Sequence, residues 1–142
     1  MNASPETREH IVKSYDEELK RLTGEIQRMG EIALAQLDAS IDAVMERDSE
    51  TAMKIVQSDA SIDALEHEVS QDVVRLLALR QPMARDLREI LAALRIAADI
   101  ERIGDHATNI AENVYFLVHG EQIAQIRRKG DTTASATAAP IS

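Results

Sequence analysis

The sequence predicts an all-α protein, an antiparallel bundle of three long helices running up, down and up. Apolar residues recur at three- and four-residue steps through three long stretches of the chain, which is the spacing of amphipathic helices. Aromatic residues form only 2% of the 142 residues, so Ala, Leu, Ile and Val must build the core. Five glycines and three prolines leave little material for hairpin turns, and a chain of this length is expected to form one domain.

The first helix is predicted from about Glu6 to about Met45. Its apolar row, at helical steps, consists of Ile11, Tyr15, Leu22, Ile26, Met29, Ala33, Leu37, Ile41 and Val44. Asp48 and Ser49 then give a turn and an N-cap signal before the short helical piece ETAMKIVQ. The first long helix is therefore expected to be followed by a short helix that reverses the chain.

The second long helix is predicted over residues 59–79 and the third over residues 84–118. Pro82 separates them, because proline lacks an amide donor and disfavours helix in the residue before it. Gly120 supplies the stop after the third helix. The third helix carries a four-and-three apolar repeat typical of a packing seam: Ile96, Ile100, Ile103, Ala107, Ile110, Val114 and Leu117.

The end of the chain differs in composition from the helical part. Residues 121–142 are low in complexity and rich in Thr, Ala and Ser. Such a segment cannot bury enough apolar surface to offset the entropy of ordering. We therefore predict a helical domain over residues 1–120 and a disordered tail over residues 121–142.

Charge and cysteine content narrow the classes of function. The net charge of −9 argues against nucleic-acid binding and against a polybasic membrane anchor. The polar, acidic start does not resemble a signal peptide, and the apolar runs are too short to span a bilayer. No cysteine is present, which removes disulfides and thiolate metal sites. A cytoplasmic protein without membrane insertion is expected.

A second row on the third helix begins apolar and becomes acidic: Leu87, Leu91, Leu94, Ala98, Glu101, Asp105, Thr108 and Glu112. Glu101 lies nineteen residues after Pro82, and Asp63 lies nineteen before it. At about 1.5 Å per residue both would lie about 28 Å from the turn. Asp59 falls nearly level with Asp105 in the same way. Antiparallel packing is therefore expected to bring the two acidic pairs side by side.

Four carboxylates held together repel one another unless they are protonated or bridged by a cation. Their hard oxygen atoms suit Mg, Ca, Mn or Fe, and two facing pairs can hold more than one ion. The alternative is that both pairs are ordinary solvated helix faces. Gly104 permits a close helix approach beside this site, or simply tight packing. His106 and His67 are expected at the surface rather than as ligands.

Two stretches, RQPMARDLR (80–88) and IAADIERIGDHATNIAE (96–112), resemble the PhoU family of phosphate-transport regulators. The segments KSYDEELKRL and SIDALE also resemble that family, and the resemblance covers roughly residues 8–120. It implies a cytoplasmic helical protein without catalytic activity that negatively regulates the phosphate-starvation response. Such proteins are thought to link the ATPase subunit of the phosphate ABC transporter to a sensor histidine kinase.

The resemblance also implies metal clusters bound by acidic-xxx-Asp motifs, which here are Glu101 with Asp105 and Asp59 with Asp63. Family members usually hold two three-helix repeats, whereas this chain has room for one. Its front resembles a first repeat and its end the close of a second, as in an internally shortened or compact member. A homodimer that replaces the missing repeat is expected.

Two other functions remain open from the residues. A carboxylate-bridged di-iron enzyme would use Glu-x-x-His pairs, and none of the four histidines has a Glu three residues before it. A plain helical scaffold would carry the acidic rows as solvated faces and would show no dependence on metal.

Overall fold

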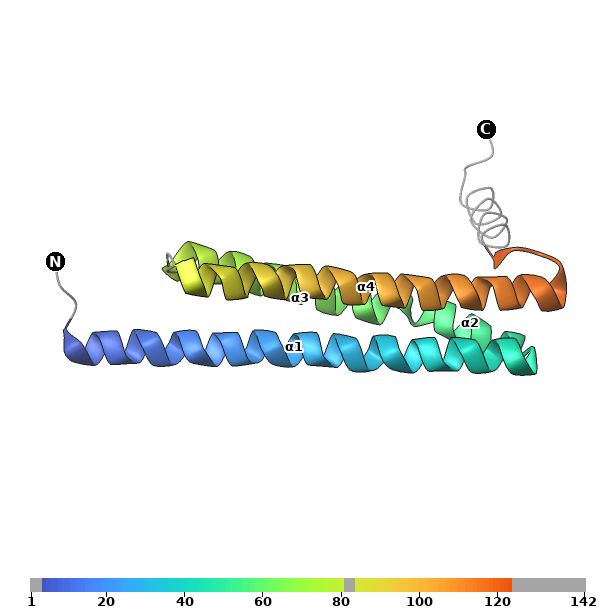
Figure 1. Ribbon diagram of the computed structural model, residues 1–142, viewed down its shortest axis with the longest axis horizontal. Helices are drawn as coiled ribbons and strands as arrows, with labels where there is room; N and C mark the ends of the chain where they lie inside the picture. Colours follow the sequence, from blue (N-terminus) through green and yellow to red (C-terminus); the bar gives the residue numbers. More distant parts are fainter. Residues whose placement is uncertain (1–3, 81–83, 124–142) are drawn as a thin grey trace, which may run out of the picture.

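The computed structural model describes residues 4–80 and 84–123 (Figure 1). It comprises α1 (Pro5–Glu46), α2 (Ser49–Gln57), α3 (Asp59–Arg80) and α4 (Ala84–His119). Figure 1 shows α1 and α4 running side by side in the same direction, while α2 and α3 return in the opposite direction. The predicted up-down-up bundle is confirmed, with α2 and α3 forming one bent second arm.

Local signals set the helix ends. Asp48 caps α2, since its Oδ1 accepts from the Thr51 amide at 3.1 Å and its Oδ2 accepts from the Thr51 hydroxyl at 2.6 Å. These hydrogen bonds hold the pKa of Asp48 below its usual value. Gly120 ends α4 with a φ of +72°, and its amide donates to the Phe116 carbonyl at 2.8 Å. Both predicted signals are confirmed.

The bend between α2 and α3 lies at Ser58. Its amide still donates to the carbonyls of Lys54 and Ile55, at 3.0 and 3.1 Å, so the last turn of α2 closes normally. Its hydroxyl donates to the Ile55 carbonyl at 2.8 Å and accepts from Nε2 of Gln36 on α1 at 2.9 Å. Ser58 therefore ends α2 and links the bend to α1.

Two apolar clusters form the core. The larger lies between α1, α3 and α4 and includes Leu22, Met29, Ile62, Val69 and Ile90. The smaller lies toward the end where α2 meets α4 and includes Ala43, Ile55, Val56, Val114 and Ile123. Because Ile123 is buried there, the packed part of the chain continues past the predicted domain end at residue 120. The rest of the predicted tail and Pro82 lie outside the described residues.

The predicted burial of α4 is partly wrong. In the apolar seam, Ala107 and Val114 are buried, but Ile96, Ile103 and Leu117 are exposed. In the second row, Thr108 is buried, whereas Leu87 and Leu91 are exposed. A helix in a three-helix bundle has only two neighbours, so its apolar faces extend beyond the surface that α1 and α3 cover.

No helix in the two described ranges combines the length and the apolar character that a membrane crossing requires.

Candidate metal centre

The two predicted acidic pairs lie where α3 begins beside the middle of α4. Asp59 is the first residue of α3 and Asp63 follows one turn later. The Thr108 hydroxyl of α4, one turn beyond Asp105, donates to Asp59 Oδ1 at 3.3 Å. This bond sets the start of α3 level with the turn of α4 that follows Asp105, three residues beyond the level that the spacing from Pro82 predicted.

The electrostatics of Asp63 and Glu101 show that the four carboxylates interact. Burial raises the pKa of Asp63, and the charges of Asp59 and Asp105 raise it further. Burial also raises the pKa of Glu101, where the neighbouring charges are Glu66, Asp63, Asp105 and Asp59. Each of the four predicted carboxylates therefore either has a raised pKa or contributes to raising the pKa of another member.

Glu66 is a fifth member of this carboxylate cluster that the sequence reasoning missed. It is half-buried, and its charge raises the pKa of both Asp63 and Glu101. It lies three residues after Asp63 and seven after Asp59, on the same face of α3. Extending the acidic row by one helical step would have found it. We refer to Asp59, Asp63, Glu66, Glu101 and Asp105 as the acidic cluster.

Gly104 allows the two helices to approach each other within the acidic cluster. A Cβ atom at this position would lie 2.8 Å from Cδ1 of Ile62, which is too close for any real contact. The same position is 3.6 Å from the Gln36 Oε1 atom, which is buried and has no hydrogen-bond partner. Both alternatives predicted for Gly104, a close helix approach or tight packing, agree with this contact, and the unpartnered Gln36 Oε1 lies beside it.

The acidic cluster has the donor chemistry of a hard-cation site but not a closed shell of ligands. Within residues 4–80 and 84–123, no three Asp, Glu or His side chains converge closely enough to hold a metal ion. Asp63 and Asp105 extend to solvent, as expected of like charges that avoid one another. Carboxylate and amide oxygens on adjacent helix turns fit Mg, Mn or Fe by ligand type.

The histidines lie apart from these oxygens, as predicted. His106 and His67 are both exposed. The Nε2 atom of His67 is 3.1 Å from Nε2 of Gln71, one turn along the same helix. Neither imidazole is among the groups that shift the pKa of Asp63 or Glu101.

A separate buried carboxylate pair, Glu25 of α1 and Asp72 of α3, was also missed. The two residues are 8% and 9% exposed. Arg21 Nε lies 3.3 Å from Glu25 Oε1 and 3.7 Å from Asp72 Oδ2, and Arg75 Nη1 lies 3.5 Å from Asp72 Oδ1. Burial and a hydrogen bond to Asp72 raise the pKa of Glu25 to about 7. Two guanidinium groups therefore already lie beside this pair.

Known proteins resemble this chain over most of its length. The sequence profile described as the PhoU domain matches residues 26–114. The "Phosphate-specific transport system accessory protein PhoU homolog" of Xylella fastidiosa (strain 9a5c) is 58% identical over 130 residues, covering 89% of this chain and 55% of the relative. The homolog of the same name from Caulobacter vibrioides (strain NA1000 / CB15N) is 44% identical over 120 residues, covering 84% and 52%.

A solved structure shares the fold. The crystal structure of PhoU from Pseudomonas aeruginosa matches with a TM-score of 0.71 at 30% sequence identity. The match covers 82% of this chain and 58% of that one. The chain therefore spans about half the length of the curated relatives it matches.

Proposed function

The chain belongs to the PhoU family, and from this premise we propose that it is a metal-binding cytoplasmic regulator of phosphate uptake. The relatives are accessory proteins of the phosphate-specific transport system by name. The proposed role is non-enzymatic: negative regulation of the phosphate-starvation response. The proposed partners are the ATPase subunit of the phosphate ABC transporter and a sensor histidine kinase, which the protein would link.

The acidic cluster is the single observation that carries the metal half of this proposal. Besides burial, the charges of Asp59, Asp105 and Glu66 raise the pKa of Asp63, and the same three charges together with that of Asp63 raise the pKa of Glu101. No Lys, Arg or His is among the groups that shift the pKa of Asp63 or Glu101. A bound divalent or ferric ion (Fe, Mn, Mg or similar) would compensate the negative charge of these carboxylates. The buried Gln36 Oε1, which has no hydrogen-bond partner, lies 3.6 Å from a Cβ atom placed on Gly104, the residue before Asp105.

Metal analysis of protein purified without chelator tests this half. We expect bound metal in the wild type and about a tenfold loss of metal per chain in Glu101→Gln and in Asp105→Asn, which keep side-chain size but remove charge. Asp99→Asn is the matched control, because Asp99 is exposed on α4 and pairs with Arg102 at 3.2 Å, apart from the acidic cluster. Equal metal content in all four proteins would reject the metal site.

Gene deletion tests the regulatory half. In medium rich in phosphate, deletion is expected to switch on phosphate-starvation genes, and the wild-type gene is expected to silence them again. A double variant, Glu101→Gln with Asp105→Asn, is expected to fail in this rescue if metal is required for regulation. Unchanged expression after deletion would contradict a negative regulator.

A helical scaffold without metal is the second candidate function. The observation that favours it is that no three carboxylates among the described residues already converge on one point. Under this alternative the acidic cluster is a solvated face, and rescue by the double variant would be complete. The metal analysis therefore separates the two functions without reference to phosphate.

We also propose that the chain acts as a homodimer. In this proposal a second copy of the three-helix bundle packs against the first.

A further inference from the structure

Two buried polar side chains lie between the two apolar clusters of the core. On α1 the larger cluster ends at Ala33 and the smaller begins at Ala39, and Gln36 lies between them. On α4 Thr108 comes just before Ala111, the first residue of the smaller cluster on that helix. Gln36 is 7% exposed and Thr108 is 8% exposed. We call these two residues the polar layer.

Both members of the polar layer hold the start of α3. The Thr108 hydroxyl donates to Asp59 Oδ1 at 3.3 Å. Nε2 of Gln36 donates to the hydroxyl of Ser58 at 2.9 Å and lies 3.4 Å from the Ser58 carbonyl oxygen. Ser58 directly precedes Asp59. Asp59 is therefore held from α4 through its own carboxylate and from α1 through the residue before it.

The amide of Gln36 is only partly satisfied. Its Nε2 atom donates to Ser58, but its Oε1 atom is buried and has no hydrogen-bond partner. A buried acceptor without a partner is unfavourable, and methionine, which is unbranched and of similar length, would fill the space without it. A buried group left unsatisfied in this way points to a role other than the stability of the fold.

Asp59 links the polar layer to the acidic cluster. Alongside burial, the charge of Asp59 raises the pKa of both Asp63 and Glu101. A carboxylate binds a metal ion more tightly when a further hydrogen bond fixes its orientation, and loss of such a bond usually lowers metal affinity about 10- to 100-fold. The bond from Thr108 to Asp59 is of this kind.

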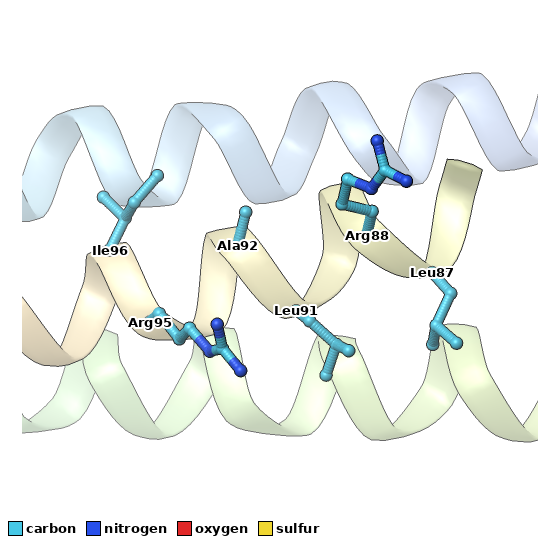
Figure 2. A pocket seen from close by; sticks show the side chains of 6 residues that line it. All are labelled: Leu87, Arg88, Leu91, Ala92, Arg95 and Ile96. Atoms are coloured by element: carbon cyan, nitrogen blue, oxygen red, sulfur yellow. The ribbon is translucent and has the colours of Figure 1, made fainter. Parts of the chain in front are cut away.

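The start of α4 offers no comparable site. Its outer side carries a groove of about 480 Å³ that is lined by four apolar side chains and by Arg88 and Arg95 (Figure 2). No carboxylate lines this groove, and two guanidinium groups repel a cation. The part of α4 suited to a cation therefore lies further along the helix, at Thr108 and the acidic residues before it.

We propose that Thr108 and Gln36 are positioning residues of the cation site, which orient Asp59 toward the other carboxylates of the acidic cluster. The proposal rests on the metal site proposed above and adds the residues that set its geometry. Thr108 fixes the carboxylate itself, and Gln36 fixes the backbone before it. All three long helices thus meet at the site, although only α3 and α4 carry its carboxylates.

The Mn²⁺ affinity of the chelator-treated full chain, measured from the electron paramagnetic resonance signal of free Mn²⁺, tests the role of Thr108. Thr108→Val keeps the shape of the side chain but removes the hydroxyl, and it is expected to raise the Kd for Mn²⁺ roughly tenfold. Thr108→Ser is the matched control, since it keeps the hydroxyl and is expected to keep the wild-type Kd.

Gln36→Met is expected to raise the Kd for Mn²⁺ roughly tenfold as well. The Tm of the metal-free variant is expected to equal or exceed that of the wild type, because methionine removes a buried oxygen without a partner. Gln27→Met is the matched control: Gln27 is exposed on α1 and donates to Glu31 of the same helix at 3.4 Å. It is expected to leave the Kd unchanged.

The outcomes separate the positioning residues from the metal site itself. A wild type that binds no Mn²⁺ would overturn the metal site and this proposal with it. A wild type that binds Mn²⁺, with an unchanged Kd in Thr108→Val and Gln36→Met, would leave the metal site intact and reject the positioning. Equal losses of affinity in Thr108→Val and Thr108→Ser would reject the role of the hydroxyl. A loss of affinity in Gln36→Met that comes with a lower metal-free Tm would show that Gln36 supports the fold rather than the site.

Discussion

Gly104→Val is expected to destabilise the bundle by about 2 kcal/mol and to remove bound metal at the same time. A Cβ atom there would lie 2.8 Å from Ile62 Cδ1, and Ile62 is fully buried, so its side chain must shift within a packed core. The shift disturbs the packing of α3 against α4 beside the acidic residues. Urea unfolding gives the change in free energy, and elemental analysis gives the metal content.

Gly24→Val is the matched control for this substitution. Gly24 also lies inside a helix, but nothing lies within 4 Å of a Cβ atom placed on it. Valine there is expected to leave the bundle equally or slightly more stable, because glycine is a poorer helix former than valine. If Gly104→Val unfolds at the same urea concentration as the wild type, the close approach of α3 and α4 is not the constraint that the geometry indicates.

Folding stability is expected to fall by roughly 2–3 kcal/mol as the pH rises from about 4.5 to about 8, owing to the Glu25–Asp72 pair. The ordinary pKa of a glutamate is 4.5, and in the folded chain the pKa of Glu25 is raised to about 7. Between these values the folded state binds more protons than the unfolded state, so its stability is complete at the low end and declines toward the high end. Urea unfolding across this range, in chelator, measures the decline.

Glu25→Gln is expected to remove most of this pH dependence. Glutamine keeps the size of Glu25 and can donate to Asp72, but it carries no titrating proton. A smaller slope should remain, because the pKa values of Asp63 and Glu101 are raised in the same direction. Glu17→Gln, an exposed change on α1, should keep the full slope. An unchanged slope in Glu25→Gln would mean that this carboxyl does not hold its proton near neutral pH.

The helices could be predicted from the sequence because their signals are local. The apolar rows, the cap at Asp48 and the stop at Gly120 each act within a few turns of helix. The structure confirms the cap and the stop. The exposure of Ile96 and Leu117 could not be predicted in this way. Periodicity identifies the apolar faces of a helix, but the number of neighbouring helices that cover those faces is a property of the assembly.

The candidate site was predictable to the extent that helix length fixes register. Equal distances from the turn at Pro82 predicted Asp59 level with Asp105, and the bond from Thr108 places Asp59 three residues further along α4. Glu66 was missed because the prediction considered only the acidic residues of the two acidic-xxx-Asp motifs. Glu66 lies three residues beyond the motif on α3.

Glu25 and Asp72 were missed for a related reason. Both occupy steps within core-facing rows, three residues after Leu22 and three after Val69. A search for apolar residues passes over a carboxylate in such a position. The face of the helix on which a residue lies decides whether its side chain is buried. When that side chain is a carboxylate, neighbouring arginines or a bound proton must compensate its charge.

Thermal melting of the chelator-treated protein, with and without added Mn²⁺, tests most directly whether the acidic cluster binds a cation. At a metal concentration 100 times the Kd, binding contributes about 2.7 kcal/mol. We therefore expect the Tm of the wild type to rise by roughly 6 to 12 °C. We expect no rise in a variant combining Glu66→Gln with Glu101→Gln. The same rise in that variant as in the wild type would contradict a metal site at the α3–α4 seam.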